Sequence, residues 1–276
     1  TVSGVTQAFD QVKAGVSNPG SDPDGIAASA LGVSSAKRQL AAELGVDPYT
    51  DFKPLSEKLD EVATTIALGG LAPKAAFSAI GGGAGAALSY SSSAEGVRAL
   101  VRDKTPAQLM ELNRQRLRAM GVSDRTVQKF LENDFYPPAD QTRLADALTR
   151  LGQVKNRAIF VDRAAGAHSR DLAYFLVRRA EMIAGYQRSS GGMITQFVSA
   201  NGFPVNILAD GRALIIAPID ELSWSETPLK AMAAISSGLS GAKPRPVELR
   251  ISGKVTPAAK AGLQGMGWTV IEGYKP

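Results

Sequence analysis

The sequence contains one histidine and no cysteine, which limits the chemistry that its side chains can perform. A Ser-His-Asp arrangement would have to use His168, with Ser169 beside it and Asp162 and Asp171 close by in the chain. No G-x-S-x-G motif, the turn that carries the serine nucleophile of many hydrolases, occurs anywhere. His168 is therefore the one candidate catalytic residue, and a solvated loop residue is the favoured interpretation.

Two further patterns contain a serine three residues before a lysine, as in the penicillin-binding serine enzymes. They are Ser34-x-x-Lys37 and Ser240-x-x-Lys243, and the companion S-D-N and K-T-G motifs do not occur. Without cysteine, the usual zinc and iron–sulfur sites are excluded, so we expect no metal and no cofactor. Catalysis by paired carboxylates remains an alternative, because sequence does not show which acidic side chains meet.

Residues 117–131 (LRAMGVSDRTVQKFL) are similar to the turn and second helix of a helix-turn-helix. Gly121 would form the turn, while Val122 and Val127 would pack inside. The side chains that would face a DNA groove are Arg125, Gln128 and Lys129. Asp124 at the end that approaches phosphate, and a net charge of only +5, argue against DNA binding. We therefore favour a capped helical hairpin, with nucleic-acid binding as an alternative.

Arg116 and Arg179 fall inside the apolar arcs of their predicted helices when residues are stepped at 100°. An arginine on such a face must find a carboxylate or carbonyl groups, because an unpaired buried charge is strongly destabilising. We expect both to be at least partly buried in structural ion pairs, with binding of an anionic ligand as the alternative. The candidate partners are Glu57, Asp60, Glu61, Asp146 and Asp162.

The elements that would position these residues change in kind along the 276-residue chain, which is long enough to bury a sizeable core. Helical patterns predominate to about residue 190, with helices expected from Ser34 to Leu44, from Thr105 to Met120 and from Ser169 to about Gln187. The charge-free stretch 75–94 is too poor in leucine, isoleucine and valine to predict a transmembrane span.

After Gly191-Gly192 the pattern predicts strands. Asp210-Gly211 between two apolar runs indicates a β-hairpin, and residues 247–251, 257–266 and 268–271 form a βαβ-like unit. Residues 247–251 alternate as a half-buried strand would, with Glu248 and Arg250 between apolar residues. The predicted fold is a mainly α-helical body over 1–190, followed by a smaller α+β C-terminal segment over 191–276 that can pack with it as one domain.

Three stretches of the sequence carry a resemblance: 44–50 (LGVDPYT), 135–142 (FYPPADQT) and 204–226, with APIDELSW inside it. Together they resemble a group of uncharacterised, exported bacterial proteins, for which no catalytic residue can be transferred to this chain. The resemblance implies a periplasmic or secreted location and a helical body without a true helix-turn-helix.

These observations favour a non-enzymatic binding or structural module of the cell envelope, with a protein or another envelope component as its partner. One alternative is a nucleic-acid binder that uses residues 117–131, although the composition argues against nucleic acid as a partner. The other is an envelope hydrolase that uses His168 or paired carboxylates.

Overall fold

A computed structural model describes residues 23–44, 46–50, 52–69, 92–240 and 245–275. The chain divides into two compact units, and each is described by itself. The first comprises residues 1–109 with 137–139, and the second residues 110–136 with 140–276. Most of the charge-free stretch 75–94 lies outside the described residues. Among the helices that are described, none has the length and apolar character to cross a membrane.

The first unit is helical. Helix α2 (Pro23–Leu44) packs against α3 (Lys53–Gly69), and α5 (Ser92–Asp103) packs on α2. Leucines and alanines spaced three and four residues apart form the α2–α3 contact, including Leu40, Ala41 and Leu59. Helix α2 begins well before the predicted start at Ser34, with Pro23 in its first turn, where the missing N–H of proline has no helical partner to lose.

The helices that follow are α6 (Pro106–Ala119), α7 (Asp124–Leu131), α8 (Pro138–Thr149), α9 (Ala158–Ala165) and α10 (Arg170–Ser189). Local signals set several of their ends. Ser123 and Ser169 cap α7 and α10 through hydrogen bonds from backbone amides, as the sequence predicts. Gly121 ends the turn after α6 with a φ of 80°, a conformation that glycine adopts without strain.

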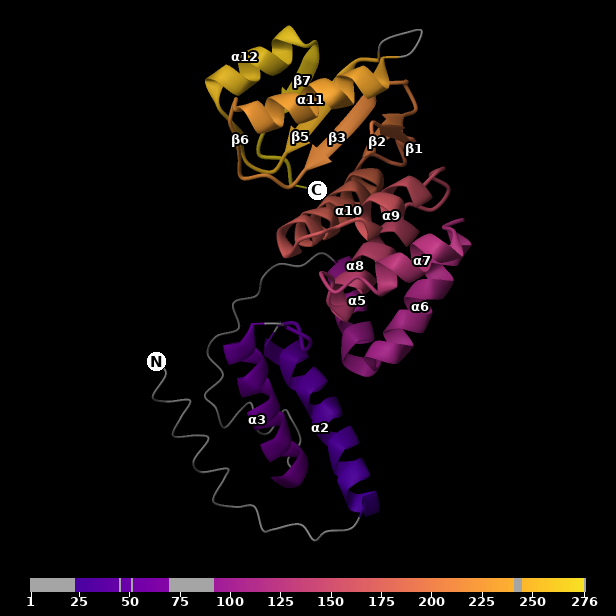
Figure 1. The fold of residues 1–276 in the computed structure, drawn as a ribbon, viewed down its shortest axis with the longest axis vertical. Helices are drawn as coiled ribbons and strands as arrows, with labels where there is room; N and C mark the ends of the chain where they lie inside the picture. Colours follow the sequence, from indigo (N-terminus) through magenta and orange to yellow (C-terminus); the bar gives the residue numbers. More distant parts are fainter. Residues whose placement is uncertain (1–22, 45, 51, 70–91, 241–244, 276) are drawn as a thin grey trace. The chain divides into compact units, whose positions relative to one another are not determined.

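The second unit contains a five-stranded sheet in the order β1 (Ile194–Ala200), β2 (Phe203–Leu208), β3 (Ala213–Ala217), β5 (Val247–Ile251), β7 (Trp268–Ile271). Strands β1, β2 and β3 are antiparallel, and β3, β5 and β7 are parallel. Helices α11 (Glu226–Leu239) and α12 (Pro257–Gly265) cover one face, while α9 and α10 cover the other (Figure 1). Short strands β4 (Glu221–Leu222) and β6 (Lys254–Val255) pair beside the main sheet.

The predicted fold class is confirmed: a mainly helical body precedes a smaller C-terminal sheet that contains the Asp210-Gly211 hairpin and the βαβ unit. The boundary expected at residue 190 does not separate compact units, because α10 packs its apolar face on the sheet. For the same reason β5 is covered on both faces, and Glu248 is buried at 5% exposure where we expected a half-buried strand.

The turn after β5 gives a direct test of this packing. A Cβ atom on Gly253 would lie 1.7 Å from the carbonyl oxygen of Asp220, and the Gly253 amide is hydrogen-bonded to Ile219 O at 2.9 Å. We expect Gly253→Ala to lower the free energy of unfolding by about 3 kcal/mol, because the backbone must move to relieve the clash. Gly265→Ala is the control, since a Cβ there meets nothing within 4 Å and alanine favours the helix. Urea denaturation that gave equal stabilities for both variants would contradict this packing.

Candidate functional site

His168 lies between α9 and α10, and its side chain is exposed. The Oγ atom of Ser169 accepts a hydrogen bond from the Leu172 amide at 3.2 Å, as the cap of α10. Asp162 Oδ1 accepts a hydrogen bond from Thr126 Oγ1 at 2.7 Å, which ties α9 to α7. Both neighbours of His168 therefore hold helices in place, and the described structure does not bring them together with the imidazole.

The first Ser-x-x-Lys pair is also used within the fold. Ser34 Oγ accepts a hydrogen bond from Arg38 Nη1 at 2.7 Å. Lys37 Nζ forms an ion pair with Asp60 at 2.7 Å, between α2 and α3. The second pair ends at Lys243, which lies outside the described residues. Ser34 and Lys37 thus bind different partners, Arg38 and Asp60.

The turn between α6 and α7 lies where the sequence places it. Val122 and Val127 are buried, and Arg125, Gln128 and Lys129 are exposed. However, α7 packs chiefly on α9, whereas the second helix of a helix-turn-helix packs on the helix before it. Ser123 caps α7 as we expected, but the packing of α7 on α9 is neither that of a helix-turn-helix nor that of a closed α6–α7 hairpin.

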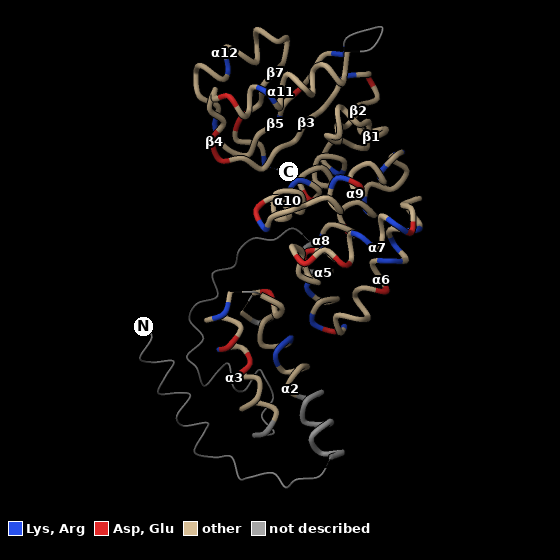
Figure 2. The backbone as a smooth tube through the Cα atoms, viewed as in Figure 1, with Lys and Arg blue, Asp and Glu red and all other residues tan. Residues whose placement is uncertain are grey.

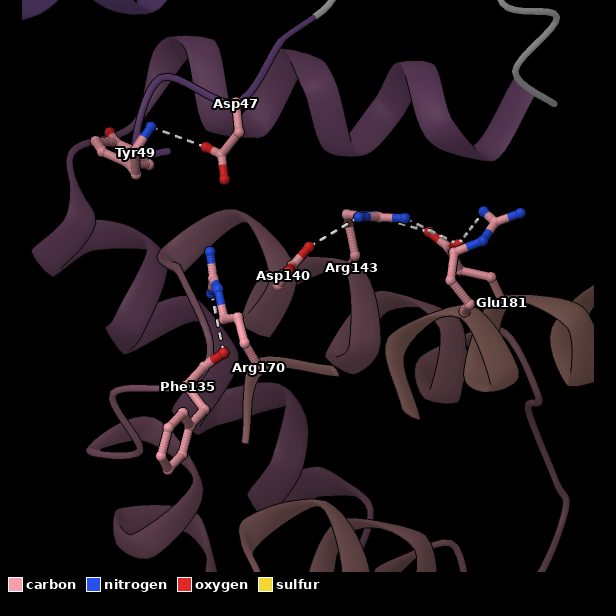
Figure 3. A network of polar contacts seen from close by, with 8 residues as sticks. Asp47, Tyr49, Phe135, Asp140, Arg143, Arg170 and Glu181 are labelled. Carbon is pink, nitrogen blue, oxygen red and sulfur yellow. Dashed lines mark hydrogen bonds and ion pairs between the residues drawn. The ribbon is translucent and has the colours of Figure 1, made fainter. Parts of the chain in front are cut away.

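Two carboxylates meet around Arg143 between α8 and α10 (Figure 3). Arg143 Nη1 donates to Asp140 Oδ1 at 2.8 Å, while its Nε and Nη2 donate to the two oxygens of Glu181 at 2.9 and 3.0 Å. Arg178 donates to Glu181 Oε2 at 2.7 Å. Guanidinium groups therefore occupy both carboxylate oxygens of Glu181.

Asp140 differs from Glu181 in its environment. Burial raises the pKa of Asp140, and the neighbouring Arg143 offsets only part of that rise. A raised pKa suits a general acid, but the second carboxylate of an acid–base pair is here saturated by hydrogen bonds. We interpret the cluster of Asp140, Arg143, Arg178 and Glu181 as a clamp that joins α8 to α10.

The carboxyl ends of β3, β5 and β7 lie at the edge of the sheet where open α/β sheets usually bind ligands. Here the segments that follow β3 and β5 pair with each other as β4 and β6. Four successive amides donate to protein oxygens: Gly253 to Ile219 O, Lys254 to Asp220 O, Val255 to Glu272 Oε1 and Thr256 to Leu222 O. The amides that could have held a phosphate group are therefore used by the fold.

Arg116 of α6 is partly buried, with 21% of its side chain exposed. Its Nη2 lies 3.7 Å from Asp146 Oδ1, and Asp146 is one of the expected acidic partners. The same carboxylate forms a closer ion pair with Arg150 at 3.0 Å. A long, partly solvated ion pair of this kind stabilises a protein little.

Arg179 of α10 is fully buried, at 0% exposure. The expected acidic partner must be corrected, since the guanidinium binds backbone carbonyls instead. Its Nε donates to Ile216 O at 2.9 Å and its Nη2 donates to Pro204 O at 2.5 Å. Arg179 therefore bridges β2 and β3, and thereby attaches α10 to the sheet.

The position of this bridge follows from the β2–β3 register. Asn206 of β2 lies opposite Leu214 of β3, and at the hairpin end the Leu208 amide donates to Arg212 O. Because hydrogen-bonded and non-hydrogen-bonded pairs alternate along antiparallel strands, this bond fixes which pairs exchange hydrogen bonds. Two residues further along, Pro204 would lie opposite Ile216 in a hydrogen-bonded pair. Because proline has no N–H, the Ile216 carbonyl lacks its ladder donor, and Arg179 Nε supplies one.

Aromatic rings enclose the buried charge. The Cζ atom of Arg179 lies 4.2 Å from the ring centroid of Phe203 and 5.6 Å from that of Phe160. Burial, and to a smaller extent the charge of Arg163, lowers the pKa of Arg179 to about 9. Arg179 is therefore charged at neutral pH, where the carbonyl dipoles and the ring faces stabilise it.

Two exposed aromatic residues are associated with Arg170, the half-buried first residue of α10. Phe135 and Tyr174 are 40% and 57% exposed. Arg170 is one helical turn before Tyr174, and its Nη1 donates to Phe135 O at 2.9 Å (Figure 3). We name Phe135, Arg170 and Tyr174 the aromatic corner. Sequence reasoning missed it, because Phe135 carried only the resemblance of residues 135–142 and Tyr174 was only one residue of the helix expected from Ser169 to about Gln187.

Comparisons with protein-family models, with curated proteins and with solved structures gave no match to this chain. In the described part of the chain, no group of three or more histidine, aspartate or glutamate side chains is placed to hold a metal ion. The functional interpretation therefore depends on contacts within the chain.

The bridge made by Arg179 predicts a large effect of its removal. Arg179→Leu leaves the buried Ile216 carbonyl without a donor and removes the bond to Pro204 O, so we expect the free energy of unfolding to fall by about 2 to 5 kcal/mol. Arg178→Leu, at the adjacent and 40% exposed position, should cost less than about 1 kcal/mol.

A Pro204→Ala background tests the cause of that effect. There the restored N–H can donate to Ile216 O, so the loss caused by Arg179→Leu should shrink by about 1 to 2 kcal/mol. Urea denaturation measures the free energy of unfolding of Arg178→Leu, Arg179→Leu, Pro204→Ala and the double variant Pro204→Ala/Arg179→Leu. Equal losses for Arg178→Leu and Arg179→Leu would contradict the bridge.

The raised pKa of Asp140 predicts a pH dependence of stability. The folded state binds this proton more tightly than the unfolded chain, so the Asp140 contribution decreases as pH rises from about 4 towards neutrality. Asp140→Asn keeps an acceptor for Arg143 and removes this dependence. We expect the variant to match or exceed the wild type in stability at pH 7, with the difference shrinking towards pH 4.

Asp124→Asn is the matched control, because Asp124 is an exposed residue in an ion pair with Arg118. Its effect should stay within about 0.5 kcal/mol across the same range. A marked loss of stability at pH 7 in Asp140→Asn would show that the Asp140 charge is stabilising, against this interpretation.

Proposed function

We propose that this chain is a non-enzymatic binding module of the bacterial cell envelope, and that it binds a protein partner through the aromatic corner. The observation that carries the proposal is the exposure of Phe135, whose carbonyl accepts a hydrogen bond from Arg170, and of Tyr174, one turn after Arg170 on α10. Phenylalanine, tyrosine and arginine are enriched at protein interfaces, where tyrosine and arginine often dominate the binding energy.

The aromatic corner is held rigidly, as an efficient binding surface requires. The Phe135 amide donates to Asn133 Oδ1 at 2.9 Å, and Asn133 Nδ2 donates to Ala167 O at 2.9 Å. Tyr174 lies on α10, the helix that Arg179 attaches to the sheet. A partner that binds here would therefore not have to order a mobile loop.

The contacts of the catalytic candidates give less support to a hydrolase. Ser169 is a helix cap, Asp162 is bonded to Thr126, and Glu181 is held by two guanidinium groups. The location in the envelope is supported by the resemblance of residues 44–50, 135–142 and 204–226 to exported bacterial proteins.

Nucleic-acid binding through α7 remains the second candidate, because Arg125, Gln128 and Lys129 are exposed as groove-facing residues would be. Asp124 and Glu132 lie at the two ends of the same helix, and acidic residues lie among the basic ones along α6–α10 (Figure 2). A duplex on this surface would bring carboxylates close to phosphates, which disfavours binding.

Site-specific photo-crosslinking in the producing cells tests the proposal. A photoreactive phenylalanine analogue at position 174 should give a discrete protein adduct, whereas the same analogue at exposed Thr227 on α11 should not. Adding Phe135→Ser should reduce the adduct at 174 at least tenfold if the aromatic corner is the binding surface, since hot-spot residues contribute about 2 kcal/mol or more. An adduct that nuclease removes would favour the second candidate, and equal labelling at 174 and 227 would overturn the proposal.

A further inference from the structure

The two edge strands of the sheet, β1 and β7, differ in whether another segment of the described chain hydrogen-bonds to them. The edge of β1 is covered by the loop before α9, where the Lys155 amide donates to Thr195 O and the Phe197 amide donates to Lys155 O, both at 3.0 Å. On the outer side of β7, no other strand among the described residues pairs with it. Among the described residues, the chain therefore pairs with one edge of the sheet and leaves the other without a partner strand.

The register shows which groups β7 presents. The Ala213 amide donates to Pro246 O and the Ser252 amide donates to Ala217 O, so even-numbered residues of β5 face β3. Odd-numbered residues of β5 must then face β7, as the bond from the Tyr274 amide to Ile251 O confirms. By the same alternation, the N–H and C=O groups of Trp268 and Val270 point outward from β7.

The composition of β7 does not protect this edge. Soluble proteins usually protect edge strands with charged residues, proline or a bulge, because an open edge pairs with other strands. Residues 268–271 are Trp, Thr, Val and Ile, all strong strand formers, and β7 is uncharged along its length (Figure 2). The Trp268 ring is fixed from inside by a hydrogen bond from Nε1 to Ser236 Oγ at 3.1 Å.

We propose that two copies of this chain associate through their β7 strands, antiparallel about a two-fold axis at Val270. Val270 then lies opposite its own counterpart, Thr269 opposite Ile271, and Trp268 opposite Glu272. No two like charges face each other in this register, and each β7 edge supplies the other with hydrogen-bond donors and acceptors. Glu272 Oε2 already forms an ion pair with Lys260 Nζ at 3.0 Å. The carboxylate can therefore approach Trp268 of the second copy without bringing an unpaired charge.

A second copy fits this edge better than an unrelated peptide, because the same short sequence is complementary to itself. The contact is small, since β7 has only four residues, and it places the dimer among weak, reversible complexes. We expect a dissociation constant of about 10 to 100 μM. The dimer does not depend on the proposed binding role of the aromatic corner, which lies on α10 and the segment before α8.

Val270→Pro tests the register directly. The Val270 N–H takes no part in the β5–β7 ladder, so proline removes an outward donor while the sheet keeps its internal bonds. Val270→Thr keeps the N–H and the branched side chain, and serves as the matched control. If Val270→Pro loses the wild-type circular dichroism spectrum, Thr269→Lys replaces it, because Thr269 is exposed and an edge lysine discourages pairing.

Sedimentation of the full chain from about 5 to 500 μM provides the measurement, over the range where such dimers form. The wild type and Val270→Thr should move from 28.9 kDa towards twice that mass, while dimerisation of Val270→Pro should weaken at least tenfold. Wild-type protein that stays monomeric at the highest concentration would overturn the proposal. So would a dimer that survives Val270→Pro but is lost in Tyr174→Ser, because it would place the contact at the aromatic corner.

Discussion

A proline inside a sheet removes a hydrogen-bond donor, and in this protein the loss falls on a strand with neighbours on both sides. Pro204 of β2 cannot donate to the Ile216 carbonyl of β3, so an acceptor in the core would be left unsatisfied. Arg179 supplies the donor from α10, between the rings of Phe203 and Phe160. Arg179 thus adds a polar link to the apolar packing between the helical layer and the sheet, and its charge is tolerated because carbonyl dipoles and ring faces surround it.

Features with a local cause could be predicted from the sequence. The caps at Ser123 and Ser169, the Asp210-Gly211 hairpin and the strand over 268–271 depend on residues close in the chain, and the structure has all of them. Long-range contacts could not be predicted. Arg179 finds carbonyls 25 and 37 residues away, and main-chain acceptors leave no mark in the side-chain pattern. Helical periodicity therefore predicted the burial of Arg179, but the expected partner was a carboxylate and the actual partners are main-chain carbonyls.

The strand β5 shows the same limit in a different form. Alternation of apolar and charged residues predicted a half-buried strand, yet Glu248 is enclosed by hydrogen bonds from Arg212 and Arg250. The Arg250 guanidinium in turn lies about 5 Å from the ring centroids of Tyr186 and Tyr274, which come from α10 and the C-terminal segment. Polar residues on this strand are covered by partners from other elements, so alternation alone cannot distinguish water from a buried ion pair as their environment.

The order of strands also affects how the chain folds as it is synthesised. β5 lies between β3 and β7, and β7 is made last, after α12. Until β7 emerges from the ribosome, β5 is an open edge strand, with Val247 and Leu249 accessible to other nascent chains. Completion of the sheet replaces this five-residue edge with the four residues of β7, so the sheet exposes its longer edge in the interval between synthesis of β5 and of β7.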